Sequence, residues 1–192
     1  MTAGRMAPLD ARVARPLEGG PSFPLRHRIF RAGWIVTWTL LARWTPPPLH
    51  GWRRLVLTLF GARLARSARV YGTARVWYPP NLTMGSHSVI GPHATCYCMD
   101  RVSIGAFAVI SQGAQLCGGT HLVDSPDFQL VTRPIAIAAH AWIAADAFVG
   151  PGVSVGEGAV LGARAVAFRD LDPWTIYAGN PARPLRTRQW RA

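Results

Sequence analysis

The sequence predicts an all-β solenoid, in which short strands and tight corners wind into stacked triangular turns. The first observation is an aliphatic residue at every sixth position, at Ile137, Ile143, Val149, Val155, Leu161 and Ala167. The second is that Ala or Gly follows each of the first five. A period of six matches neither an α-helix nor a simple strand, but it matches a short strand followed by a corner. Three such units per turn would bury a continuous aliphatic column.

Length and composition indicate one folded domain with a short appendage. The chain has 192 residues, 49% hydrophobic and only 16% charged, so a sizeable core is expected. The net charge of +12 favours anionic partners such as nucleic acid, anionic lipid, a phosphorylated cofactor or an acidic glycan. Its 21 basic residues are all Arg and are spread out, without zinc-finger spacing or an RNA-binding aromatic signature. Nucleic acid is therefore not expected as a partner.

The cysteines and the apolar runs suggest a cytoplasmic protein. Cys96, Cys98 and Cys117 are odd in number and form no CxxC pair, which argues against a disulfide framework or a zinc ribbon. We expect them to be small buried side chains in a reducing compartment. No signal peptide is evident, and the apolar run 33–42 is far shorter than the roughly 20 residues of a membrane span.

Four sections follow one another along the chain. Residues 1–25 are a basic tail that we expect to be flexible. Residues 26–66 are expected to form short amphipathic helices. Residues 67–168 carry the repeat, which the loop 117–134 interrupts, and residues 169–192 form a C-terminal extension. Before the loop the repeat has phase shifts, with aliphatic or similar residues at Met84, Ile90, Cys96, Val102, Ile104, Ile110 and Leu116.

The helical section has an apolar stripe whose partner the sequence leaves open. The Pro-rich stretch 45–51 separates two helices, and the second places Trp52, Leu55, Val56 and Leu59 on one face. A stripe next to Trp and Arg residues either packs on the solenoid or lies on an anionic membrane surface. Packing is favoured, because most amphipathic helices of soluble proteins face a core.

The repeat also resembles a known family. An aliphatic residue, Gly or Ala and four further residues are the unit of the hexapeptide-repeat acyltransferases, whose fold is a left-handed parallel β-helix. The segments 60–91, 102–121 and 172–186 resemble the O-acetyltransferases of colanic acid biosynthesis, relatives of the maltose, galactoside and nodulation-factor acetyltransferases. The resemblance implies a homotrimer that binds acetyl-CoA between neighbouring prisms and acetylates a sugar hydroxyl. It further implies an acceptor that is a lipid-linked exopolysaccharide precursor.

The loop supplies the candidate catalytic residue. In the family that this chain resembles, the His in the Gly-rich turn before the loop is the general base, and here it is His121. An imidazole titrates near neutral pH, so it suits removal of a hydroxyl proton. The resemblance implies direct transfer in a ternary complex, which leaves no role for Cys117 as nucleophile. Related enzymes often carry an acid directly after this His, whereas Leu122 stands here.

Acidic residues near His121 are the candidates for orienting its imidazole and for binding the acceptor. Asp124 and Asp127 follow His121 in the loop, and Asp100 comes from the preceding coil. Each is a candidate to orient the imidazole. Asp100 and Asp124 are also the expected substrate-binding residues.

The coenzyme site is assigned by the resemblance. Arg169 and Arg183 look like the cations that contact CoA in related enzymes, since its phosphates need positive charge. Ala145 and Ala163 match positions where the pantetheine arm meets backbone amides, and Trp142 matches an aromatic residue beside the base. The alternatives are solvated surface Arg residues and a Trp that packs at the trimer interface.

Competing functions remain open or are disfavoured. A γ-class carbonic anhydrase needs three zinc-binding His, two of them five residues apart, and this spacing is missing. Long-chain acyltransferases that use acyl carrier protein have more coils and a helical C-terminal domain. A non-catalytic assembly platform and an amino-sugar N-acetyltransferase are kept as alternatives. His27 and His50 are expected at the surface, and no metal is expected.

Overall fold

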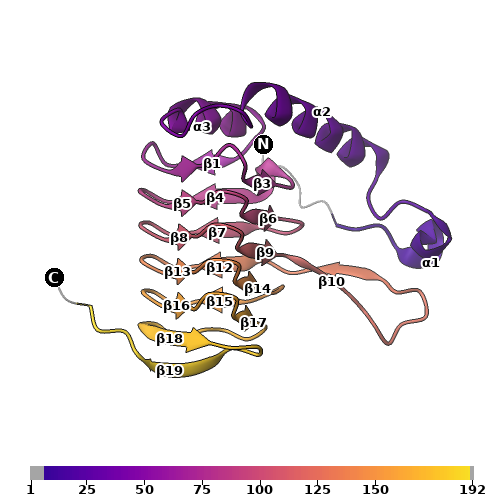
Figure 1. Ribbon diagram of the computed structural model, residues 1–192. Coiled ribbons are helices and arrows are strands. Elements are labelled where there is room, and N and C mark those ends of the chain that lie inside the picture. The colour runs from indigo at the N-terminus through magenta and orange to yellow at the C-terminus, as the bar shows by residue number, and fades with distance from the viewer. Residues whose placement is uncertain (1–6, 191–192) are drawn as a thin grey trace.

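The computed structural model describes residues 7–190, so residues 1–6 of the expected tail and 191–192 of the extension lie outside the described residues. The chain winds into a prism of stacked turns, capped at its N-terminal end by two helices (Figure 1). The expected parallel β-solenoid is confirmed. Each turn contributes one strand to each of three parallel sheets, because every six-residue unit is one strand and one corner.

The three sheets form the faces of the prism. The first sheet contains β1 (Arg63–Leu64), β4 (Leu82–Met84), β7 (Val102–Ile104), β12 (Ile135–Ile137) and β15 (Ser154–Val155). The second contains β2 (Arg69–Val70), β5 (Val89–Ile90), β8 (Val109–Ile110), β13 (Trp142–Ile143), β16 (Val160–Leu161), β18 (Thr175–Ala178) and β19 (Arg183–Thr187), the last antiparallel. The third contains β3 (Arg75–Val76), β6 (Thr95–Tyr97), β9 (Gln115–Cys117), β14 (Phe148–Val149) and β17 (Val166–Ala167).

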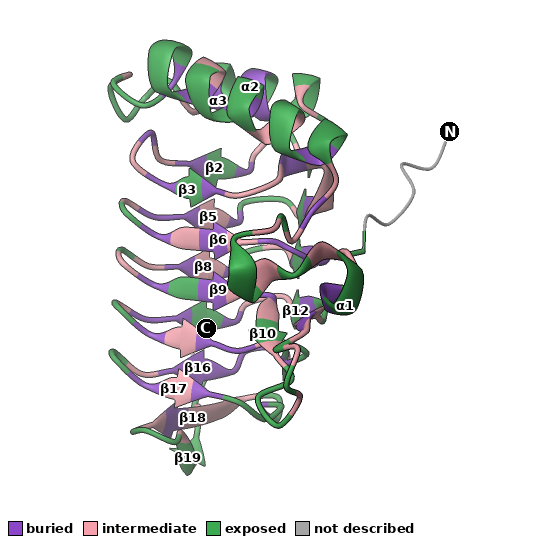
Figure 2. Ribbon diagram, turned by 90° about the vertical axis from the view of Figure 1, so that its right-hand side faces the viewer, coloured by how far each residue is buried: buried purple, intermediate pink, exposed green. Residues whose placement is uncertain are grey.

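The aliphatic residues of the repeat form the core. All six members of the uninterrupted series 137–167 are at most 2% exposed. In Figure 2 buried residues recur along the strands of successive turns. Burying one Val, Leu or Ile side chain contributes about 1.5–3 kcal/mol, so the repeat supplies most of the stabilisation of the solenoid.

The small residue of each unit is needed for stacking. A Cβ at Gly85 would lie 2.6 Å from the backbone nitrogen of Ala106, and one at Gly105 would lie 2.5 Å from that of Ala139. The corner itself turns two residues later, where φ is positive, as at Phe107 (59°). The glycines of the repeat therefore admit the next coil, while a neighbouring residue makes the turn.

The N-terminal helices cover the first turn of the solenoid. α2 (Leu25–Leu41) buries Trp34 and Trp38, whose indole N–H groups donate to the carbonyls of Val76 (2.6 Å) and Gly72 (3.1 Å). α3 (His50–Leu59) follows the Pro-rich break. Within the described residues, every helix is too short or too polar to cross a membrane.

The favoured packing of the apolar stripe of α3 on the solenoid is wrong for three of its four residues. Trp52, Leu55 and Leu59 are 41%, 50% and 76% exposed, whereas Val56 is buried as expected. The helix instead turns Arg53 inward, where Nε donates to the Val70 carbonyl at 2.6 Å and the terminal nitrogens bond to the carbonyls of residues 45–47. These hydrogen bonds of the buried Arg53 set the rotation of α3 and leave Trp52, Leu55 and Leu59 facing outward.

The described part of the expected tail packs on the rest of the chain. It contains α1 (Ala11–Ala14) and the 3₁₀ turn η1 (Pro16–Glu18), while a second 3₁₀ turn, η2 (Pro79–Asn81), lies in the solenoid. Phe23 is 4% exposed and packs with Met99 and Leu130. Its ring also stacks on His27, which is 1% exposed, so the expected surface position of His27 is wrong. The aromatic residues around it account for its burial.

Candidate active site

The loop that interrupts the repeat is an antiparallel hairpin. It leaves the prism after β9 and consists of β10 (Gly119–His121) and β11 (Leu130–Thr132), with His121 opposite Leu130. The Leu122 amide donates to the Gln129 carbonyl at 2.9 Å and continues the ladder toward the tip. Figure 1 shows the hairpin projecting from the side of the stack. The repeat therefore pauses to place His121 beside the prism rather than in its wall.

A backbone carbonyl orients the imidazole of His121. Its Nδ1 lies 2.8 Å from the carbonyl oxygen of Phe128, and its ring stacks on the Phe128 ring with centroids 4.2 Å apart. A carbonyl oxygen only accepts, so the neutral ring carries its proton on Nδ1 and leaves the lone pair on Nε2. This is the tautomer that can take a proton at Nε2.

The acids named from the sequence lie in different surroundings. Asp127 pairs with Arg12 through Oδ2 and Nε at 3.2 Å. Asp124 is exposed in the turn of the hairpin. Asp100 is 2% exposed, and one of its oxygens accepts from the Arg101 amide at 2.8 Å. The contact of Nδ1 is thus with the Phe128 carbonyl and not with a carboxylate that follows His121.

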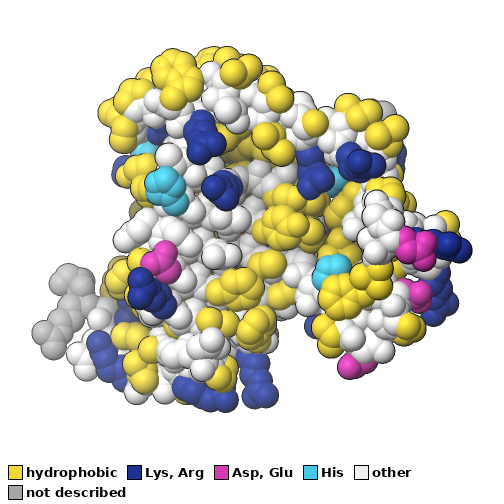
Figure 3. Space-filling view, turned by 45° about the vertical axis from the view of Figure 1, so that its right-hand side comes forward, with side chains coloured by type: hydrophobic (Ala, Val, Ile, Leu, Met, Phe, Trp, Pro, Cys, Tyr) yellow, Lys and Arg dark blue, Asp and Glu magenta, His cyan; other side chains and the backbone are white. Residues whose placement is uncertain are grey.

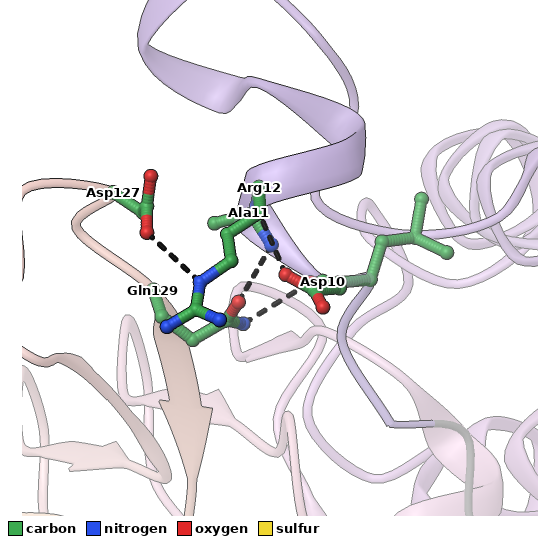
Figure 4. A network of polar contacts seen from close by, with 6 residues as sticks. Asp10, Ala11, Arg12, Asp127 and Gln129 are labelled. Carbon is green, nitrogen blue, oxygen red and sulfur yellow. Dashed lines mark hydrogen bonds and ion pairs between the residues drawn. The ribbon is translucent and has the colours of Figure 1, made fainter.

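Residues 9–12 hold the hairpin from the outside (Figure 4). Gln129 Oε1 accepts from the Ala11 amide at 2.6 Å, and its Nε2 donates to the Leu9 carbonyl at 3.1 Å. The Arg12–Asp127 ion pair lies beside these bonds. Residues 9–12, part of the segment expected to be a flexible tail, therefore clamp the hairpin at Asp127 and Gln129, just before β11.

His121 lines a pocket of about 400 Å³ between the hairpin, the solenoid and the start of α2. The solenoid contributes Trp77, Tyr97 and Met99, and α2 contributes Arg28 and Arg31. The sequence analysis did not identify these residues. The parallel register of β3 and β6 places Trp77 next to Tyr97, with ring centroids 5.3 Å apart. Because the two residues are one coil apart in the sequence, their spacing could have predicted this contact.

The expected coenzyme residues occupy other parts of the solenoid. Arg169 and Arg183 line a second pocket, of about 420 Å³, near the C-terminal end. Ala145 and Ala163 lie at corners one coil apart, where the Ala145 carbonyl accepts from the Arg164 amide at 2.9 Å. Trp142 is 44% exposed, and its Nε1 donates to Ser111 Oγ at 2.9 Å.

These two pockets have no lining residue in common. One chain therefore brings Arg169 and Arg183 together in one pocket. It brings His121 together with Arg28 and Arg31 in the other. The two groups of residues do not meet within a single chain. Among the described residues, no cluster of three or more His, Cys, Asp or Glu side chains is arranged to hold a metal ion.

Comparison with known proteins identifies the family, although no protein-family model matches the chain. The chain is 38% identical over 155 residues, covering 81% of this chain and 85% of the relative, to the protein of Escherichia coli (strain K12) that bears the name colanic acid biosynthesis acetyltransferase WcaF. A Shigella flexneri protein of the same name matches equally.

Solved structures share the fold. A hexapeptide-repeat acetyltransferase of Vibrio cholerae, VCA0836, complexed with acetyl-CoA, aligns with a TM-score of 0.74 at 21% identity, over 84% of this chain and 88% of that one. A galactoside acetyltransferase in complex with CoA aligns with a TM-score of 0.77 at 21% identity, over 85% and 83%. The solenoid, the projecting hairpin and the match to WcaF together show that this chain belongs to the hexapeptide-repeat acetyltransferases, with WcaF as a relative.

Proposed function

We propose that this acetyltransferase moves the acetyl group of acetyl-CoA directly to a sugar hydroxyl, with His121 as general base. The observation that carries the proposal is the hydrogen bond from Nδ1 to the Phe128 carbonyl, which leaves Nε2 as acceptor beside a pocket. The name of the WcaF relatives supports a role in exopolysaccharide biosynthesis. The acetyl-CoA and CoA complexes of the structural neighbours support the choice of donor.

The proposed chemistry needs one base. His121 Nε2 takes the proton of the acceptor hydroxyl while the hydroxyl oxygen bonds to the thioester carbonyl carbon. The Phe128 carbonyl accepts from Nδ1–H throughout, which favours the imidazolium that forms. The C–S bond then breaks, and His121 returns the proton to the leaving sulfur, so that the acetyl ester and the free thiol of CoA result. Such a base contributes roughly 10²–10⁴-fold.

The coenzyme site is proposed to lie between two chains. Arg169 and Arg183 would bind the CoA phosphates, and Trp142, Ala145 and Ala163 would lie along the pantetheine arm. Because the pocket of these Arg residues is separate from that of His121, we propose a homotrimer in which each site joins two copies. A chain that stays monomeric in light scattering while fully active would contradict this arrangement.

Complementation tests the shared site directly. Co-expressed His121→Asn and Arg169→Glu/Arg183→Glu chains should form mixed trimers in which some sites combine an intact base with intact cations. Activity should therefore reappear in the mixture although each parent is inactive. A mixture with no more activity than its parents would place both groups in one chain.

The proposed base is tested by acetyl transfer with a matched pair of variants. Release of CoA thiol is followed over a panel of sugars and lipid-linked sugars, and hydroxylamine treatment distinguishes an ester product from an amide. His121→Asn should lower kcat by about 100-fold or more without changing the melting temperature. His93→Asn, at an exposed corner, is the control. Full activity of His121→Asn would show that His121 is not the general base. An amide product would indicate an N-acetyltransferase. No turnover with any acceptor would favour an assembly platform.

The outer face of the helical cap is proposed to lie on the cytoplasmic face of an anionic membrane. Leu40, Trp44 and Leu59 are 63%, 73% and 76% exposed there, and Figure 3 shows a hydrophobic band over the cap with basic side chains beneath it. An apolar face combined with a charge of +12 suits anionic lipid headgroups. Sedimentation with anionic vesicles, reduced by Leu40→Gln/Leu59→Gln, is the expected result. Equal sedimentation of both proteins would reject the contact.

A further inference from the structure

The pocket that contains His121 carries positive charge without a matching acid. Of the described residues that line it, Arg28 and Arg31 are the Arg residues, and none is Asp or Glu. Among residues 7–190, neither Arg28 nor Arg31 takes part in an ion pair. The first turn of α2 also holds no acidic residue, so the positive end of its macrodipole is not offset there.

Arg31 is held in place although, among the residues that the structure describes, no carboxylate pairs with its charge. Its guanidinium carbon lies 4.3 Å from the centroid of the Trp77 ring, a cation–π contact. Its Nε is buried and, within the described residues, has no hydrogen-bond acceptor. Burial lowers the pKa of Arg31, and the neighbouring Arg28 lowers it further. A buried N–H of a cation without an acceptor is costly, so a ligand that supplies one would be bound with a large gain.

The rest of the pocket suits a sugar. Trp77 and Tyr97 form an aromatic wall, and a volume of about 400 Å³ lies within the range of small-molecule sites. Guanidinium groups bind carboxylates and phosphates through paired hydrogen bonds. One pocket thus contains a base at Nε2 of His121 and two cations that recognise an oxyanion.

We propose that the acceptor is an anionic sugar, whose carboxylate or phosphate binds Arg28 and Arg31 while a hydroxyl of the sugar meets His121. The inference rests on the proposed function and adds the chemical class of its acceptor. The acetyl transfer itself is the same as proposed above. The anionic group only positions the sugar, and the hydroxyl still gives its proton to Nε2 of His121. A uronic acid and a sugar phosphate share this chemistry.

Matched acceptors test the inference and distinguish the two sources. Methyl glucuronide is compared with its neutral methyl ester, and glucose 1-phosphate with methyl glucoside, using the full-length protein and thiol release from acetyl-CoA. For at least one pair, kcat/KM should be higher for the anionic sugar by about tenfold or more. The pair that shows this preference tells whether the recognised group is a carboxylate or a phosphate. Arg28→Gln/Arg31→Gln should bring the ratio close to one. Arg26→Gln is the control, because Arg26 lies on the same helix but outside the pocket.

Binding to an inactive variant separates this inference from the proposed function. Calorimetric titration of His121→Asn with the same four compounds should show binding of the favoured anion, lost when Arg28→Gln/Arg31→Gln is added. If the anion binds in this way but the unchanged protein never transfers acetyl, the proposed function fails and the anion site stands. Transfer to neutral and anionic sugars at equal kcat/KM, or an anion preference that survives the Arg substitutions, would overturn the anion site.

Discussion

Removing the side chain of Gln129 should release the hairpin that carries His121. Gln129→Ala removes two hydrogen bonds from the hairpin to residues 9–11, those to the Ala11 amide at 2.6 Å and the Leu9 carbonyl at 3.1 Å. Each is worth about 0.5–1.5 kcal/mol, so about 1–3 kcal/mol is lost. The nearby Arg12–Asp127 pair is largely exposed and contributes about 0–1 kcal/mol. Gln129 is therefore the stronger of the two contacts.

Hydrogen exchange measures this loss. The opening equilibrium of residues 119–132 should rise by about 5- to 150-fold, the range that corresponds to about 1–3 kcal/mol, while the amides of β13 and β16 keep their protection. Gln189→Ala, which removes an exposed amide side chain, is the matched control and should change nothing. Unchanged exchange of the hairpin in Gln129→Ala would refute the claim that residues 9–12 clamp it.

Three further predictions concern stability and are checked by thermal or denaturant unfolding. Arg53→Leu removes the hydrogen bonds of a fully buried guanidinium to the carbonyls of Val70, Thr45 and Pro46 and should cost at least about 2 kcal/mol; an unchanged melting temperature would contradict this. Gly105→Ala places a Cβ 2.5 Å from the Ala139 backbone nitrogen and should cost about 1–3 kcal/mol, whereas Gly33→Ala, in open space on α2, should stabilise. Burial, and next the charge of Arg31, lowers the pKa of His27 from 6.5 to about 4. The folded state therefore disfavours its protonation, so stability should fall by up to about 3 kcal/mol between pH 6.5 and 4, and His27→Phe should remove that part of the pH dependence; parallel pH profiles would refute it.

The solenoid was predictable because its constraint repeats. Residues such as Ile143, Val149 and Leu161 must all point inward at a spacing of six, and each further coil adds an independent instance of the same requirement. The hairpin was visible as a break in this spacing. At these positions the local residue pattern agrees with the overall fold, so the buried positions of the solenoid could be predicted from the sequence alone.

The rotation of α3 was not predictable, because its sequence contains two apolar faces. The stripe of Trp52, Leu55, Val56 and Leu59 is one, and Val56 with Leu57 makes an overlapping second, which is the buried one. The choice between them depends on Arg53, whose acceptors lie in the Pro-rich stretch and at Val70. A single buried side chain that donates to several carbonyls outweighs the spacing of the apolar residues.

The surroundings of His121 were hidden for a related reason. The partner that orients its imidazole is the backbone carbonyl of Phe128. Because every residue has such a carbonyl, the amino-acid sequence does not indicate which one accepts from His121. Arg28 and Arg31 come close to His121 because α2 lies over the N-terminal end of the solenoid and its start lines the same pocket as His121. Contacts across such long separations follow from the packed fold and not from local pattern.

A crystal structure of the protein with acetyl-CoA and an unreactive acceptor analogue tests the central claim most directly. The account predicts three chains around a common axis, with the thioester of each coenzyme beside His121. The acceptor hydroxyl should lie about 2.6–3.2 Å from Nε2, with Nδ1 still bonded to the Phe128 carbonyl. A coenzyme whose acetyl group lies away from residue 121, or an Nε2 turned toward another protein group, would contradict it.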